Sequence, residues 1–192
     1  MYSILAGLMI AMGGYLYLII GGIPGAFFFA LGLMTIVHFG FNLFTGKAGL
    51  LATDEIGFDD LFGIWCGNFL GCLSGAVLTF FTPNGLVASE RATAIIQNKV
   101  ANGPLENFVL AIGCGMLMYI AVRGYKDTKN LVYVFVPVAA FILGGFNHCV
   151  ADMYYLCLGG WEVTDFGILL PITLGNIVGT NILPAGIRYY QS

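Results

Sequence analysis

The chain has 192 residues, of which 59% are hydrophobic and only 9% are charged, whereas about 25% of residues are charged in an ordinary soluble domain. A mean hydropathy of +0.90 and 28 Gly residues are typical of a polytopic membrane protein, in which Gly lets helix backbones approach closely. The net charge of −3 argues against nucleic acid as a partner, and the five Cys lack the spacing of a metal site, so neither a metal nor a cofactor is expected.

Six stretches are apolar and long enough to cross a bilayer, which takes about 20 mostly apolar residues. They cover residues 3–20, 24–52, 61–82, 105–123, 131–158 and 167–187. The first has no basic leader and no cleavage site, so a retained span is expected rather than a signal peptide. The sequence therefore predicts an all-α membrane protein with six transmembrane helices in a single domain, residues 1–192.

The second and fifth stretches are longer than one crossing requires, and both contain Gly and polar residues midway. The polar residues are Asn42, Thr45 and Lys47 in the second stretch and Asn147, His148 and Asp152 in the fifth. Backbone that leaves the helix at membrane depth must be satisfied by protein or by water in a cavity. Both spans are therefore predicted to be broken helices that mark a pathway through the bilayer.

Lys and Arg are distributed unequally between the two sides of the membrane. One side carries Lys47, Arg123, Lys126, Lys129 and Arg188, and the other carries Arg91 and Lys99. Because basic residues accumulate on the cytoplasmic side, both termini are expected to be cytoplasmic in a multi-pass protein of the cell membrane.

The two halves of the chain, approximately residues 1–85 and 105–192, resemble each other. Three matches occur in order: Leu5-Ala6 with Leu110-Ala111, Gly40-Phe41-Asn42 with Gly145-Phe146-Asn147, and residues 67–71 with 175–179. Their offsets are 105, 105 and 108. Since each half has three spans, an odd number, the second half must enter the membrane from the opposite side. An inverted repeat of this kind places the substrate site near the midplane, where the broken helices meet.

The offset of 105 also pairs Lys47 with Asp152. A lone charge within the bilayer costs at least ~2.5–3.5 kcal/mol by insertion scales, so these opposite charges are expected to pair. The alternative is that Lys47 reaches the cytoplasmic surface and Asp152 bonds only to backbone or water.

Four segments make the sequence recognisable: residues 42–46, residues 67–71, residues 145–148 followed by Ala151-Asp152-Met153, and residues 170–177. Together they resemble the formate/nitrite transporter family, and the resemblance covers all six spans. It implies an aquaporin-like fold, a homopentamer in the lipid bilayer with one pore per protomer, and substrates such as formate, nitrite, hydrosulfide and lactate.

The resemblance also assigns pore residues. It makes His148 the central pore histidine and Thr45 the hydroxyl that faces it. The cytoplasmic-side constriction is assigned to Leu43 and Phe44, the outer constriction to Phe29, Leu33 and Phe141, and the outer entrance to Lys99. Four positions depart from the family pattern: Asn42 replaces an acidic residue, Asn147 a Glu, Asp152 an Asn and Gly115 an Asn. The usual helix before the first span is missing, and the loop at residues 159–166 is short.

These residues favour a channel or transporter for small monovalent anions or their weak acids. His148 either protonates the entering anion or stays neutral and only hydrogen-bonds it. Asn42 and Asn147 are expected to brace the broken helices, and Asn68 and Asn176 to hydrogen-bond between helices. The alternatives are a neutral-solute pore of aquaporin-like type and a non-transporting scaffold or sensor. An enzyme is not expected, because His148 and Asp152 are too few polar groups to assemble a reaction site.

Overall fold

The computed structural model describes residues 1–159 and 162–191, and the regular elements in this part of the chain are all helices. In chain order they are α1 (Tyr2–Ile20), α2 (Gly22–Phe39), α3 (Phe44–Ala48), the 3₁₀ helix η1 (Gly49–Thr53), α4 (Phe58–Phe80), α5 (Gly85–Thr128), α6 (Val132–Leu143), α7 (Cys149–Gly159), the 3₁₀ helix η2 (Val163–Ile168) and α8 (Leu169–Gln191). The predicted all-α class is confirmed. Of the predicted loop at 159–166, residues 160 and 161 lie outside the described residues.

Five helices in the described part of the chain are long and apolar enough to cross a bilayer: α1, α2, α4, α5 and the segment Thr164–Tyr190, which covers all but the last residue of α8. Helices α6 and α7 have 12 and 11 residues, so each is too short to cross alone. Together they cover the stretch predicted as the fifth span. The second span is likewise divided, into α2 and the short α3.

Both predicted helix breaks are present, and they begin in the same way. Gly40 follows α2 and Gly145 lies just beyond α6, each with φ of 71° in the left-handed region that favours glycine. The hydrogen bonds that close these ends run from the Phe41 N–H to the Ile36 carbonyl and from the Phe146 N–H to the Phe141 carbonyl, both 2.9 Å long. The breaks are narrower than predicted, because Thr45 and Lys47 already lie in α3 and Asp152 lies in α7.

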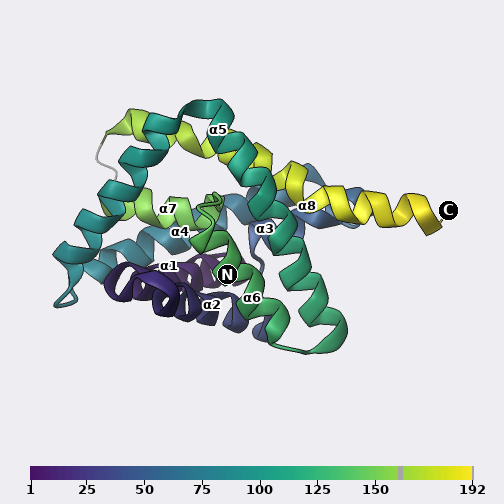
Figure 1. Cartoon of the computed structure of the whole chain (residues 1–192), viewed down its shortest axis with the longest axis horizontal. Coiled ribbons are helices and arrows are strands. Elements are labelled where there is room, and N and C mark those ends of the chain that lie inside the picture. The colour runs from purple at the N-terminus through teal and green to yellow at the C-terminus, as the bar shows by residue number, and fades with distance from the viewer. Residues whose placement is uncertain (160–161, 192) are drawn as a thin grey trace.

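Helix α5 is two helical segments joined by a bend that the sequence analysis did not predict. Gly103 has φ of 78°, outside the helical region, and Pro104 follows it. Figure 1 shows α5 arching over the top of the molecule before it descends beside α6. Residues 85–102 thereby pack against α7, where Ser89 and Thr93 donate hydrogen bonds to the carbonyls of Leu158 and Gly159.

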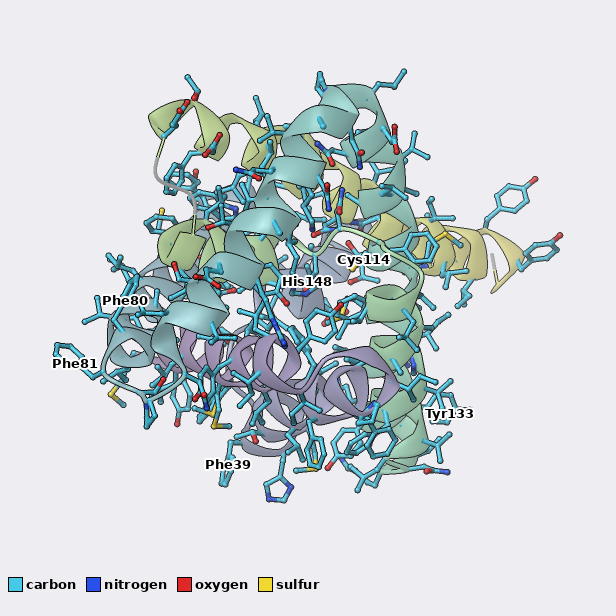
Figure 2. The ribbon with its side chains drawn as sticks, turned by 60° about the vertical axis from the view of Figure 1, so that its left-hand side comes forward. Phe39, Phe80, Phe81, Cys114, Tyr133 and His148 are labelled. Atoms are coloured by element: carbon cyan, nitrogen blue, oxygen red, sulfur yellow. The ribbon has the colours of Figure 1, made fainter. Side chains whose placement is uncertain are left out.

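The outer surface of the helical body is strongly apolar. Phe39, Phe80, Phe81 and Tyr133 point outward, whereas His148 and Cys114 lie among the helices (Figure 2). Phe81 is 85% exposed and Phe39 is 62% exposed. A surface of this kind is suited to lipid or to another apolar protein surface rather than to water.

Glycines let two pairs of helices approach closely. A Cβ atom on Gly71 in α4 would lie 2.1 Å from the carbonyl oxygen of Ile4 in α1. A Cβ atom on Gly179 in α8 would lie 2.1 Å from the carbonyl oxygen of Ile112 in α5. The α1–α4 and α5–α8 contacts therefore use corresponding positions that differ by 108 in sequence.

These glycine contacts give a different alignment of the first span with the fourth span than one of the sequence matches did. The match of Leu5-Ala6 with Leu110-Ala111 implies an offset of 105 between the first and fourth spans, three residues less than the packing gives. A shift of three residues is close to one helical turn, so it leaves nearly the same helix face in place. Sequence similarity alone therefore could not distinguish the two registers.

Substitution at Gly179 tests the close packing of α8 on α5. Gly179→Val is expected to lower the thermal midpoint of the detergent-solubilised protein, because overpacking a helix contact costs about 1–3 kcal/mol. Gly186→Ala in the same helix is the control, since a Cβ there meets nothing within 4 Å. Equal midpoints for the two variants would contradict the contact.

Candidate functional site

The first helix break is held by one buried asparagine of α4. The Asn68 Oδ1 atom accepts a hydrogen bond of 2.8 Å from the N–H of Phe44, the first residue of α3. Its Nδ2 atom donates to the carbonyls of Asn42, at 2.9 Å, and Ser3, at 2.7 Å. A single side chain therefore satisfies three backbone groups at membrane depth, where water is not available to do so.

The second break is held in the same way by α8. The Asn176 Oδ1 atom accepts from the N–H of Cys149, the first residue of α7, at 2.8 Å. Its Nδ2 atom donates to the carbonyls of Asn147, at 2.9 Å, and Ala111, at 2.8 Å. The expectation that Asn68 and Asn176 hydrogen-bond between helices is confirmed.

His148 lies at the second break with both ring nitrogens engaged. Its Nδ1 atom accepts the N–H of Ala151, at 3.1 Å, so the imidazole caps the start of α7. Its Nε2 atom lies 2.8 Å from the Thr45 hydroxyl oxygen of α3. Because Nδ1 is an acceptor, these contacts imply the neutral tautomer with the proton on Nε2, which donates to Thr45.

Two cavities reach this pair of residues. One, of about 240 Å³, is lined by Leu43, Thr45 and Lys47 together with the C-terminal end of α5. The other, of about 230 Å³, is lined by Phe141 and His148 together with residues 95–102 of α5. The α5 residues that line the first cavity lie between 119 and 126, whereas those that line the second lie just before the bend at Gly103. The long α5 segment after the bend separates the two sets, so the cavities lie toward opposite faces of the protein. The hydrogen bond between Thr45 and His148 lies between them.

Apolar side chains pack on both sides of that hydrogen bond. The Phe141 ring stacks on the imidazole of His148 with 5.5 Å between ring centroids, and the rings of Phe29 and Phe141 form a T-shaped pair with 5.8 Å between centroids. Phe29, Phe141 and Leu33 are buried, and so are Leu43 and Phe44 around the first break. Of the residues that the resemblance assigned to the two constrictions, Phe141 thus contacts His148 and Phe29 contacts Phe141.

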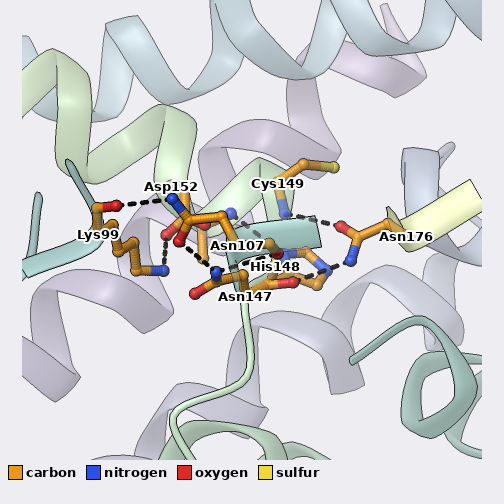
Figure 3. Close-up of polar contacts among 8 residues, drawn as sticks. Lys99, Asn107, Asn147, His148, Cys149, Asp152 and Asn176 are labelled. Carbon is orange, nitrogen blue, oxygen red and sulfur yellow. Dashed lines mark hydrogen bonds and ion pairs between the residues drawn. The ribbon is translucent and has the colours of Figure 1, made fainter. Parts of the chain in front are cut away.

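The predicted pair of Lys47 and Asp152 is wrong. Asp152 forms its ion pair with Lys99, and the side chains of Lys99 and Asp152 are only 14% and 0% exposed (Figure 3). Lys47 lines the cavity on the other side of the Thr45–His148 hydrogen bond. The physical reason is the bend of α5, which brings Lys99 over α7, a contact that the offset between the repeats could not indicate.

Asn107 connects the ion pair to the helix break, and sequence reasoning missed it. Its Nδ2 atom donates to the Lys99 carbonyl across the bend, and its Oδ1 atom accepts from the side chain of Asn147 at 2.9 Å (Figure 3). Asn147 therefore braces the break, as predicted. The available signal was an amide at the third position of the predicted span 105–123.

A second missed residue is Asn181 in α8. Its side chain accepts the N–H of Ala52 at 2.8 Å and donates to the carbonyl of Ala48 at 2.9 Å. These bonds tie α3 and η1 to α8. Asn42 contributes to its own break through its backbone carbonyl, which Asn68 binds.

The sequence profile of the formate/nitrite transporter family matches residues 1–190. The chain belongs to the formate/nitrite transporter family. As a family member it is a multi-pass membrane protein, and it is a channel or transporter rather than an enzyme. The prediction of a multi-pass membrane protein and the prediction that it is not an enzyme are therefore confirmed.

Family members of named function are similar over most of the chain. The formate channel FocA of Haemophilus influenzae is 26% identical over 196 aligned positions, which cover 81% of this chain and 69% of that protein. A probable formate transporter of Methanothermobacter thermautotrophicus is 28% identical and covers 98% of this chain, with 86% of its own length aligned. A solved structure described as a pentameric formate channel with formate bound superposes with a TM-score of 0.80 at 24% identity. The superposition covers 99% of this chain and 94% of the chain of that structure. This match establishes the aquaporin-like fold of the family.

Loss of one bracing amide tests the architecture of this family member. Asn176→Leu is expected to lower the thermal midpoint in detergent, because a buried backbone group left without a partner costs about 1–3 kcal/mol. Ser74→Ala is the matched control, since the Ser74 hydroxyl bonds only within its own helix and is exposed. A midpoint for Asn176→Leu equal to that of the control would show that Asn176 does not support the break.

Proposed function

We propose that this protein is a channel for small monovalent anions or their weak acids, of the formate, nitrite or hydrosulfide class. The observation that carries this proposal is the hydrogen bond between Thr45 and His148, which separates two cavities that open to opposite faces. The names of the relatives in Haemophilus and Methanothermobacter support formate as the first solute to test.

The apolar side chains around the central pair act as two constrictions. Leu43 and Phe44 form the first, and Phe29, Leu33 and Phe141 form the second. A bare anion loses its hydration in such a constriction, which is costly in an apolar environment. A neutral weak acid does not carry that penalty. The constrictions therefore favour passage of the protonated form.

His148 acts in this pore as a neutral hydrogen-bond donor. A second proton on the ring would have to displace the Ala151 N–H from Nδ1. It would also put a cation at the N-terminus of α7, where the helix dipole is unfavourable to positive charge. The Nε2–H group, which now donates to Thr45, is the group that a passing carboxyl or nitrite oxygen would accept. The proton on the solute is then supplied by bulk water.

The cavity beside Thr45 forms the cytoplasmic mouth. Lys47, Arg123, Lys126 and Lys129 line it, with Glu55 as the acidic residue among its lining. This excess of basic residues attracts anions, and by the positive-inside rule it supports the assignment of this side as cytoplasmic. Both termini belong to this side of the membrane, and Lys99 belongs to the outer mouth.

The assembly is a homopentamer in the lipid bilayer, with one pore in each protomer. The support is the solved structure described as pentameric, which matches this chain over nearly its whole length. The strongly exposed apolar side chains on the outer surface provide area for contacts with neighbouring protomers and with lipid.

Flux into proteoliposomes tests the proposal. Formate, nitrite and hydrosulfide uptake is measured at an acidic and a near-neutral pH for the native chain, His148→Ala and His148→Asn. Native flux is expected to be faster at acidic pH, because more of each solute is protonated. In both variants the flux is expected to fall about tenfold or more below the native flux, since a lost buried hydrogen bond costs about 1–3 kcal/mol. Asn can still cap α7 but is too short to reach Thr45, so it separates the donor role from the capping role.

The outcome that contradicts the proposal is equally clear. If no anion enters above the empty-liposome background while the native protein remains folded, the anion channel is wrong. Uptake of uncharged solutes such as glycerol would then favour the neutral-solute pore. Absence of that uptake as well would favour the scaffold or sensor.

A further inference from the structure

The outer cavity is electrically neutral, although a lysine lines it. Its charged lining residues, among those the structure describes, are Lys99 and Asp152, and these two form an ion pair. His148 is the other ionisable nitrogen base of this lining, and its contacts imply the neutral form. Tyr17 and Tyr155 add phenol groups without formal charge. The mouth therefore presents no net charge to an entering anion.

The opposite cavity differs sharply in charge. Four basic side chains line it, with Glu55 as the acidic residue among its described lining. Arg123 is partly neutralised by Asp127 at 2.7 Å, but both groups are exposed and hydrated. The two mouths of one pore are therefore electrostatically unequal.

Two features favour a charged Asp152 in this position. It lies in the first turn of α7, where the helix dipole favours an anion, and its Oδ1 atom binds the ammonium of Lys99. Its Oδ2 atom is buried and has no hydrogen-bond partner in the described part of the chain. The hydrogen bonds of the Asp152 carboxylate are therefore incomplete, and holding the fold together does not account for its presence. Asn107, through the Lys99 carbonyl and Asn147, performs that bracing.

We infer that Asp152 weakens anion capture at the outer mouth by cancelling the charge of Lys99, so that anions are captured weakly there and strongly at the opposite mouth. The inference rests on the proposed function and adds an asymmetry to it. An unpaired ammonium at about 6 Å from the solute, at an effective dielectric constant of about 40–80, would strengthen anion capture about three- to tenfold. Asp152 removes this attraction at the entrance to the outer constriction.

The test compares formate uptake by right-side-out and inside-out membrane vesicles that contain the native chain or a variant. Asp152→Asn keeps the size of the side chain and leaves Lys99 unpaired. It is expected to lower the half-saturating formate concentration about three- to tenfold in right-side-out vesicles, and to leave it unchanged in inside-out vesicles. The gain is expected to shrink at high ionic strength, because salt screens the attraction between Lys99 and an anion that is still in solution.

Two further variants separate charge from packing. In Lys99→Gln with Asp152→Asn, both charges are absent, so the half-saturating concentration is expected to return to the native value. Glu106→Gln is the matched control, since it also changes an acid to an amide but at an exposed position outside the cavity lining. It is expected to behave like the native chain.

The possible failures are distinguishable. If the native chain takes up formate and Asp152→Asn shows the same half-saturating concentration and salt dependence, the role of Asp152 in anion capture is overturned. The proposed channel would stay intact. An equal change in both vesicle orientations would overturn it as well. No formate uptake by the native chain or any variant would overturn the proposed function and this inference with it.

Discussion

The structure depends on one requirement, that backbone groups exposed at a helix break within the bilayer must find partners in the protein. Two asparagines meet it. Asn68 and Asn176 each bind the first N–H of a half-helix, a carbonyl in the break itself and a carbonyl of a third helix. Because each amide connects three segments, the breaks, the helix packing and the position of the half-helices are fixed together.

The central site follows from the same arrangement. The half-helices α3 and α7 begin close to each other, so the Thr45 hydroxyl of one reaches the imidazole of the other. His148 caps its own half-helix through Nδ1, which leaves the Nε2 proton directed at the path between the cavities. Under the proposed function, a residue that completes the backbone of the break is therefore also the residue placed to meet a solute. This dual role is why the variant His148→Asn is informative: Asn can cap α7 but is too short to reach Thr45.

The sequence was sufficient for the architecture because its strongest signals are local. Gly40 and Gly145 stand where the backbone turns left-handed, and apolar length locates the spans. The partners of charges were not predictable in this way, since Lys99 reaches Asp152 only through the bend at Gly103. The repeat offset suggested Lys47 instead, because the offset says nothing about Lys99, which lies between the two predicted repeats. Asn107 and Asn181 were missed for a similar reason: their importance comes from contacts with groups far away in the sequence, the Asn147 side chain and the Ala48 carbonyl.

The position of the bracing asparagines along the chain has a consequence for biogenesis. Each asparagine lies in the span after the broken one: Asn68 follows the break at residues 40–43, and Asn176 follows the break at residues 144–148. During synthesis, each broken span therefore emerges from the ribosome before the side chain that completes it. Its N–H and carbonyl groups must stay hydrated, or stay within the insertion machinery, until the next span arrives. The second and third spans, and likewise the fifth and sixth, are thus expected to enter the bilayer as pairs.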